Sequence, residues 1–204
     1  MIVLEADAAG DDQQVRATVV DDTGEAKVIA FPVEGAAPDL ADRLPIAEAI
    51  RAVDVLEHVT DDERWIGNLA GQLVSGGRLT IRLPLEGPMA WLDALNIYRY
   101  VQDSTGIWKD LEETRLKGWH RHYRVDEVVR MTEASGMNVT SIVRSGSPHV
   151  EAVRFAGLAW GVMRKRELQA ESQLRRWGKE AAVRTSHMRL GPCSTWVTIE
   201  ARKT

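Results

Sequence analysis

Two residues suited to chemistry, Glu57 and His58, follow an apolar run that is typical of a β-strand, residues 50–56. Open α/β sheets bind ligands outside the carboxyl ends of their strands, so we expect both side chains to lie beside a bound molecule. A histidine at this place can act as a general base or orient a substrate hydroxyl. The alternative is that His58 only hydrogen-bonds to the neighbouring loop.

A second pair of histidines, His120 and His122, is spaced so that the two imidazoles would share a face if the segment were a strand. With Trp119 they can line the acceptor side of a cleft. Two histidines at this spacing can also bind a metal ion, but no nearby cysteine or carboxylate pair completes a ligand set, and we predict no metal site. The alternative is a tethering loop that packs over the sheet.

The elements that must position these residues alternate between strand and helix from residue 50 to residue 143. Thr60 and Glu63 form a capping box that starts a helix, and Gly76 with Gly77 ends it. Further strands are predicted over residues 78–83, 139–143 and 195–201, and further helices over 89–102, 125–135 and much of 150–178. This alternation predicts an α/β layered fold with a parallel sheet, and the last strand is compatible with an antiparallel edge.

Before residue 50 the pattern differs, because three strand candidates, residues 2–4, 15–20 and 27–33, are joined by short connections. The last two flank a turn that begins with Asp21 and Asp22, and they can form an antiparallel hairpin. Two abbreviated parallel strands are the alternative, although parallel strands normally need about a dozen connecting residues. Local chemistry favours the hairpin.

The composition of the 204 residues is that of one soluble globular domain, with a formal net charge of −4 and a pI near 5.8. This charge gives no reason to expect nucleic-acid binding. No apolar run approaches the roughly 20 residues that span a bilayer, and the N-terminal segment lacks the basic start of a signal peptide. The single cysteine, Cys193, cannot form an intramolecular disulfide, which favours a cytoplasmic protein.

Several motifs between Asp54 and Leu79 occur in the order and at the separation found in class I S-adenosylmethionine-dependent methyltransferases, which the chain resembles. Residues 54–59 read D-V-L-E-H-V, as at the end of the family's fourth strand. Residues 73–79 carry the L-x-x-G-G-R-L pattern of its fifth strand. Residues 119–126 and 133–142 resemble the segments around its next helix and strand. The closest likeness is to compact predicted methyltransferases with an abbreviated N-terminal half.

The resemblance implies a single Rossmann-like methyltransferase domain over residues 1–204, with an antiparallel C-terminal strand. Residues 1–49 would form the abbreviated cofactor-side half, and residues 50–204 the core, with a helical insertion at about 150–189. This insertion is rich in arginine and lysine. Such a charge run indicates either a solvated helix face or a docking surface for an anionic partner.

The resemblance also implies S-adenosylmethionine as the cofactor, held partly by the loop after the first strand. Glu5, Asp7 and Gly10 belong to that loop, which has one glycine where the family has two or three. Glycine suits this position because a Cβ obstructs both the turn and the close approach of the backbone to the ligand. Leu56 and Glu57, at the end of the fourth strand, would line the same cofactor site.

Three acidic residues complete the cofactor site that the resemblance implies. Asp21 or Asp22, after the second strand, would accept hydrogen bonds from the ribose hydroxyls; the alternative is that both are turn residues. Asp42 would contact the adenine amino group, or it is an exposed loop acid. All three lie in the half of the chain that matches the family least well.

Two functions are consistent with these features. The first is methyl transfer from S-adenosylmethionine to a small-molecule or glycan-like acceptor, with His58, His120 or His122 as the base that an oxygen acceptor would need. The second is a methyltransferase-like protein without cofactor that acts as a binding or assembly module, with a protein partner or as a homo-oligomer. The first function is the leading hypothesis, whereas the glycine-poor loop, the predicted hairpin and the basic helical insertion suit the second.

Overall fold

The computed structural model describes residues 1–7, 14–20, 25–32, 44–59, 61–88, 121–146 and 193–204, together with isolated positions between 90 and 104 and between 152 and 156. The chain divides into two compact units. The first comprises Met1–Pro84, Arg121–Val143 and Val197–Thr204, and the second Leu85–His120 and Arg144–Trp196. The helices predicted over residues 89–102 and 150–178 lie largely outside the described residues.

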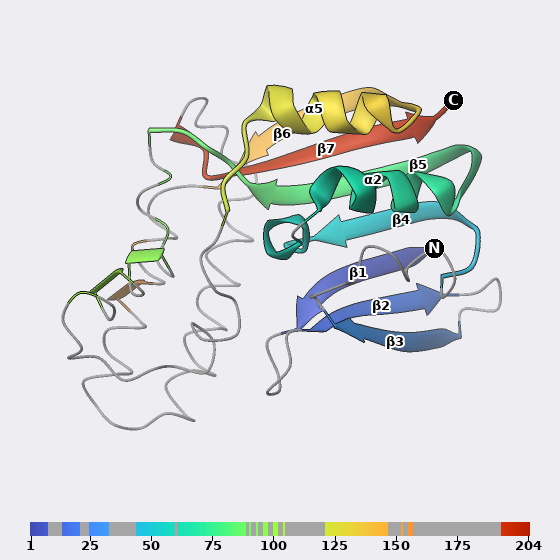
Figure 1. The fold of residues 1–204 in the computed structure, drawn as a ribbon, viewed down its shortest axis with the longest axis horizontal. Coiled ribbons are helices and arrows are strands. Elements are labelled where there is room, and N and C mark those ends of the chain that lie inside the picture. Colours follow the sequence, from blue (N-terminus) through green and yellow to red (C-terminus); the bar gives the residue numbers. More distant parts are fainter. Residues whose placement is uncertain are drawn as a thin grey trace. The chain divides into compact units, whose positions relative to one another are not determined.

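A seven-stranded sheet organises the first unit, in the order β3-β2-β1-β4-β5-β7-β6 (Figure 1). Its last strand, β7, runs antiparallel to its neighbours β5 and β6, as the arrows in Figure 1 show. The predicted α/β fold with an antiparallel C-terminal strand is therefore confirmed, although this strand lies inside the sheet rather than at its edge. The strands are β1 (Ile2–Asp7), β2 (Gln14–Val20), β3 (Ala26–Pro32), β4 (Ala47–Val53), β5 (Leu73–Pro84), β6 (Met137–Ser145) and β7 (Trp196–Lys203).

The first three strands form an antiparallel meander. β2 pairs with β1 from Asp7 opposite Gln14 to Ile2 opposite Val19, and β3 pairs with the other side of β2. The predicted hairpin is thus confirmed, and the alternative of abbreviated parallel strands is wrong. The connections, residues 8–13 and 21–25, are shorter than the dozen or so residues that a parallel crossover needs.

The strand β4 ends three residues before the predicted boundary. Asp54 adopts a left-handed backbone conformation with φ of 54°, which aspartate tolerates better than most residues and which interrupts the strand. Leu56, Glu57 and His58 consequently form a turn of 3-10 helix, η1 (Leu56–His58), rather than the end of the strand. The Asp54 N–H still donates to the carbonyl oxygen of Arg82 at 3.1 Å, which keeps the turn attached to β5.

The helix α2 (Asp62–Gly71) begins one residue later than the capping box predicts. Asp61 is its N-cap, with Oδ1 accepting a hydrogen bond from the Arg64 N–H at 3.1 Å. The predicted cap, Thr60, lies outside the described residues. Asp62 and Glu63 in the first turn stabilise the positive end of the helix dipole.

The strand β5 starts earlier than predicted and takes up the residues expected at the end of the helix. Ala47 of β4 is opposite Leu73 of β5, whereas Ala49, only two residues later, is opposite Arg78. The additional residues of β5 therefore bulge outward. Gly76 has a φ of 76°, and a Cβ on Gly77 would lie 2.8 Å from the carbonyl oxygen of Val74. The two glycines therefore permit a bulge in a strand and do not end the helix.

The helix α5 (Val125–Ala134) and the strand β6 match their predicted positions, and Gly136, with a φ of 80°, separates them as predicted. α2 and α5 lie side by side on one face of the sheet (Figure 1). The core is formed between these helices and the alternate strand residues that face them. It includes Ile2, Leu4, Ile50, Ala52, Leu79, Ile81, Leu83, Val197, Ile199, Trp65, Ile66, Leu69 and Val128, all at most 1% exposed. Among the described helices, none is long and apolar enough to cross a membrane.

Candidate functional site

The winding of the sheet changes direction between β1 and β4. The chain adds β2 and β3 on one side of β1, and then β4 and β5 on the other side. β1 and β4 are parallel, from Ile2 opposite Ile50 to Glu5 opposite Val53, so their carboxyl ends lie at the same edge of the sheet. Open α/β sheets bind their ligands at such a switch point, outside the carboxyl ends of the strands.

The residues that follow β4 place buried polar groups at this edge. Val55, Leu56 and Glu57 are at most 5% exposed, and both carboxylate oxygens of Glu57 are buried. Within the part of the chain that the structure describes, Oδ1 of Asp54 is buried and accepts no hydrogen bond. Burying a polar atom without a hydrogen bond costs free energy, so such an atom indicates a place where a ligand or water can donate.

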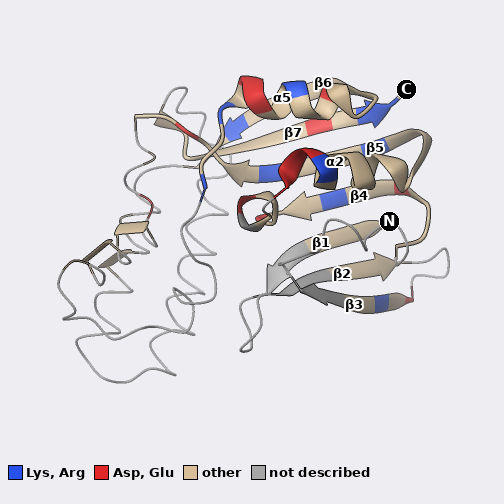
Figure 2. Ribbon diagram, viewed as in Figure 1, with Lys and Arg blue, Asp and Glu red and all other residues tan. Residues whose placement is uncertain are grey.

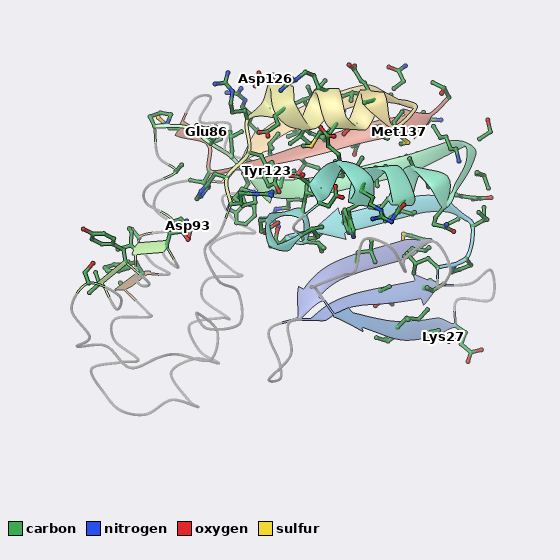
Figure 3. The ribbon with its side chains drawn as sticks, viewed as in Figure 1. Lys27, Glu86, Asp93, Tyr123, Asp126 and Met137 are labelled. Atoms are coloured by element: carbon green, nitrogen blue, oxygen red, sulfur yellow. The ribbon has the colours of Figure 1, made fainter. Side chains whose placement is uncertain are left out.

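A tyrosine that the sequence analysis did not select holds the turn η1 in place. Tyr123, which Figure 3 labels, is 1% exposed. Its hydroxyl donates to the carbonyl oxygen of Leu56 at 2.9 Å. Its backbone N–H donates to the carbonyl oxygen of Pro84 at 3.1 Å, which fixes the segment to the end of β5. Burial raises the pKa of the Tyr123 hydroxyl, so this group remains a hydrogen-bond donor at neutral pH.

Arg121 ties the same segment to the start of α2. Its guanidinium lies 3.2 Å from the Asp62 carboxylate and 5.5 Å from the centre of the Tyr123 ring. The Arg121 side chain is 43% exposed and that of Asp62 is 18% exposed, so solvent screens this ion pair and it contributes little to stability. Its effect is to orient the residues on either side of His122.

The structure brings two of the predicted catalytic segments together. His58 is the last residue of η1, whose first residue, Leu56, accepts the hydrogen bond from Tyr123. His122, which is half-buried, directly precedes Tyr123 in the chain. The segments that carry His58 and His122 therefore meet at the carboxyl edge of the sheet. The sequence marks Tyr123 only as one of two large aromatic residues, with Trp119, in a strongly polar stretch.

The predicted cofactor residues are distributed unevenly over the described structure. Leu56 and Glu57 lie in η1 at the switch point. Glu5 and Asp7 lie on β1, where Glu5 is opposite Val53 of β4 and Asp7 is opposite Gln14 of β2. Outside the described residues are Gly10, Asp21, Asp22, Asp42 and His120.

The direction of β2 bears on the ribose role predicted for Asp21 and Asp22. β2 ends at Val20, which exchanges hydrogen bonds with Met1 at 2.9 and 3.0 Å. The carboxyl end of β2 therefore lies at the edge where β1 begins, opposite to the edge where β1 and β4 end. A ribose carboxylate supplied by the end of the second strand requires a parallel β2, and this strand is antiparallel.

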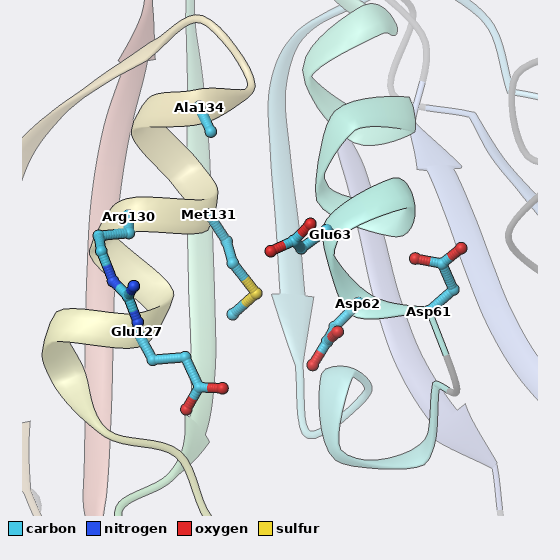
Figure 4. Close-up of a pocket in the computed structure, with 7 residues that line it drawn as sticks. All are labelled: Asp61, Asp62, Glu63, Glu127, Arg130, Met131 and Ala134. Carbon is cyan, nitrogen blue, oxygen red and sulfur yellow. The ribbon is translucent and has the colours of Figure 1, made fainter.

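An acidic groove runs between the two helices of the first unit (Figure 4). The carboxylates come mainly from the start of α2, and α5 contributes a glutamate and an arginine. This groove lies on the outer side of the helices and contains none of the predicted site residues. Its lining residues are Asp61, Asp62, Glu63, Glu127, Arg130, Met131 and Ala134.

The position and direction of β7, together with the parallel β1, β4 and β5 and the helices between strands, identify the architecture. The chain has the Rossmann-like methyltransferase fold. No protein-family model and no curated protein sequence matches the chain. Eight of the solved structures that resemble it have between 10% and 15% sequence identity and TM-scores of 0.40 to 0.45.

Three of these structures illustrate the likeness. Phosphoethanolamine N-methyltransferase 2 of Haemonchus contortus, in complex with S-adenosyl-L-methionine, is 13% identical, with a TM-score of 0.42 over 76% of this chain and 33% of that protein. Magnesium protoporphyrin IX methyltransferase of Synechocystis PCC 6803, with bound SAH, is 11% identical, with a TM-score of 0.42 over 81% and 48%. The cyclase SpnF is 15% identical, with a TM-score of 0.44 over 79% and 53%. The chain thus spans between a third and about half of the length of these proteins.

Proposed function

We propose that this protein binds S-adenosylmethionine where β1 and β4 end and transfers its methyl group to a small-molecule or glycan-like acceptor. The observation that carries this proposal is the switch point itself. β1 and β4 are adjacent and parallel, and a buried turn with polar atoms follows β4 at the edge where such folds bind ligands. The single cysteine, Cys193, supports a cytoplasmic setting.

The polar groups at this edge of the sheet suit the hydrogen-bond donors of the cofactor. The buried Glu57 carboxylate can accept a hydrogen bond from a cationic amino group or a hydroxyl. So can Oδ1 of Asp54, which accepts no hydrogen bond from the described residues. Glu5 and Asp7, also predicted to bind the cofactor, belong to the last residues of β1, which runs parallel to β4. β2 presents no carboxyl end here, so we assign the cofactor to β1 and η1 rather than to Asp21 and Asp22.

When bound, the cofactor supplies an electrophilic methyl group on its sulfonium centre. The residues of this chain then have to position the acceptor atom and exclude water. An oxygen acceptor needs a base, and His58 and His122 are the first candidates because their segments meet through the hydrogen bond from Tyr123 to Leu56. His120 is the third, and a nitrogen acceptor needs no base.

Thermal unfolding with S-adenosylhomocysteine tests cofactor binding without an acceptor. A ligand that binds only the native state at 100 times its Kd adds about 2.7 kcal/mol to the free energy of unfolding. For a chain of this size that corresponds to a rise in Tm of roughly 5–10 °C. We expect Glu57→Gln to reduce the rise and the matched control Glu63→Gln, on the exposed start of α2, to retain it.

Variants of the two ribose candidates then separate the two possible cofactor sites. Because β2 ends at the opposite edge, we expect Asp21→Ala and Asp22→Ala to retain the full rise in Tm. Loss of the rise in either variant would restore the predicted ribose role and contradict our assignment. No rise at millimolar S-adenosylhomocysteine in the unmodified protein would reject the cofactor and the enzyme together.

A second candidate function is a binding or assembly module without cofactor, acting on a protein partner or as a homo-oligomer. The observation that favours it is the antiparallel meander of β1, β2 and β3, which stands where nucleotide-binding sheets have crossover helices. In nucleotide-binding sheets a helix after the first strand normally directs its N-terminus at the ligand, whereas here the described element that follows β1 is the antiparallel β2. The melting experiment distinguishes the two functions.

A further inference from the structure

The described sheet ends at β3 on one side and at β6 on the other, with a basic band on each of these strands (Figure 2). β3 carries the exposed Lys27 near its start and ends at Pro32, which has no backbone N–H to donate. Lysine and proline on an outer strand hinder pairing with a strand of another molecule. The edge at β3 is therefore protected.

The strand β6 lacks both of these protecting features. Its nine residues, M-N-V-T-S-I-V-R-S, include neither proline nor lysine, and Arg144 is the one charged residue. Ile142 is 46% exposed and Val143 is 38% exposed, although β-branched apolar side chains suit a half-buried place on a sheet. Adjacent residues of a strand point to opposite faces, so each face of the sheet exposes an apolar side chain at this edge. β6 is thus suited to pairing with a further strand.

The sequence of β6 is compatible with pairing to its own copy. In the antiparallel register that pairs all nine residues, Ser141 lies opposite Ser141 of the second copy. Val139 then lies opposite Val143 of the second copy. Thr140 lies opposite its Ile142. Cross-strand pairs of β-branched side chains stabilise antiparallel sheets, so both exposed apolar side chains of this edge gain a suitable neighbour.

The same register suits the charge of the strand. Arg144 lies opposite Asn138 of the second copy, and the amide oxygen of asparagine can accept a hydrogen bond from a guanidinium. Both residues are exposed and accessible to a second copy. Like charges directly opposite one another destabilise a strand pair, and this register brings none together. The two-fold symmetry of the pair repeats the contact at its other end.

We propose that two copies of this chain form a dimer by antiparallel pairing of their β6 strands. The two seven-stranded sheets then join into one continuous sheet with β3 at both outer edges. The nine residues of β6 extend about 30 Å, and main-chain hydrogen bonds along this length supply the attraction. A two-fold interface occupies β6 in both copies, and the protected β3 disfavours growth beyond two copies.

Sedimentation equilibrium of the full chain tests the dimer, because association depends on concentration. We expect the mass to rise from 22.7 kDa toward twice that value as the concentration increases to about 500 µM. Ile142→Lys should raise the dissociation constant about tenfold or more, since a lysine opposes pairing at an edge and the lysines of the two copies become diagonal neighbours. The matched control is Val28→Lys, which changes an exposed β-branched residue on β3 and should leave the constant within about twofold.

Two further measurements test the register. Asn138→Glu places a carboxylate opposite Arg144 of the second copy at both ends, and the dissociation constant should fall about twofold to tenfold. Adding Arg144→Glu should reverse this gain, because like charges then meet. In a Cys193→Ser background, Ser141→Cys should form a disulfide-linked dimer, since antiparallel partners lie about 4.5–5.5 Å apart at Cα, within the range of a disulfide. Val28→Cys in the same background should stay monomeric on a non-reducing gel.

Each outcome bears on a separate part of the proposal. Far-UV circular dichroism and Tm verify that every variant folds. A chain that stays monomeric at about 500 µM would overturn the second copy as the occupant of this edge. An Ile142→Lys variant that dimerises like the unmodified protein, or a Ser141→Cys variant that cross-links no faster than Val28→Cys, would overturn the assignment to β6. None of these outcomes depends on whether the protein binds S-adenosylmethionine.

Discussion

Replacing Tyr123 by phenylalanine removes the hydroxyl that joins the segment before α5 to the turn η1. The ring stays in place, because Phe fills the same buried space and only one oxygen is lost. The change therefore isolates the hydrogen bond from the Tyr123 hydroxyl to the Leu56 carbonyl oxygen, which is 2.9 Å long and buried.

The size of the effect follows from the partners of the Leu56 carbonyl oxygen. Leaving a buried acceptor without any hydrogen bond costs about 1–3 kcal/mol. This carbonyl oxygen also accepts a hydrogen bond from the Val59 N–H at 3.1 Å, so it keeps one partner in the variant. We therefore expect Tyr123→Phe to lower the free energy of unfolding by only about 1 kcal/mol, the net value of one ordinary hydrogen bond.

Urea unfolding followed by far-UV circular dichroism measures this difference at pH 7. Tyr100→Phe is the matched control, because Tyr100 is 65% exposed and its hydroxyl is accessible to water. We expect the control to stay within about 0.5 kcal/mol of the unmodified protein. A Tyr123→Phe variant as stable as the control, or one destabilised by more than about 3 kcal/mol, would refute the reasoning from two acceptor partners.

The pH dependence provides an independent reading of the same contact. Burial raises the pKa of the Tyr123 hydroxyl above the ordinary value of about 10, so the unfolded chain ionises first. The stabilisation by the neutral hydroxyl is fully present below about pH 10 and is lost as the pH rises toward the raised pKa. The stability difference between the unmodified protein and Tyr123→Phe should therefore shrink in alkaline solution and stay constant from pH 6 to 9.

Two further predictions concern the local geometry of α2 and β5. Asp61→Ala removes the N-cap acceptor of the Arg64 N–H and should cost about 1 kcal/mol of stability, and Asp61→Ser should restore most of it; an alanine variant without loss would contradict the cap. Gly77→Ala should destabilise by about 1–3 kcal/mol, since its Cβ would meet the Val74 carbonyl oxygen at 2.8 Å. Gly67→Ala, with no atom within 4 Å of the added Cβ, should instead stabilise α2 by about 0.5–1 kcal/mol, and equal effects at both glycines would disprove the bulge.

Predictions from local sequence succeeded where one signal dominated. The helix α5 was predicted within one residue, because apolar residues recur at helical spacing and Gly136 ends the pattern. The hairpin of β2 and β3 was also predicted, since the short connection leaves no room for a parallel crossover. Glu57 and His58 were expected at the carboxyl edge of a central strand, and η1 lies there.

Predictions failed where a tertiary contact competes with a local preference. Gly76 and Gly77 suit a helix end as well as a bulge, and the pairing of Leu73 with β4 decides between them. The strand β4 stops at Asp54 because its backbone turns left-handed, although residues 50–56 form a continuous apolar pattern. The sequence did not predict the role of Tyr123, because that role depends on a hydrogen bond to a residue 67 positions away in the chain.

The sequence by itself determined the class of the fold and the segment that forms its carboxyl edge, because periodicity and turn chemistry act over a few neighbouring residues. Only the tertiary structure decided the direction of β2, and with it which carboxylates share an edge with Glu57. It also separated the buried positions of β4 and β5 from the more exposed ones on strands whose pattern alternates. Both decisions depend on which strands lie side by side, and backbone pairing between distant segments is not encoded in any short stretch of the chain.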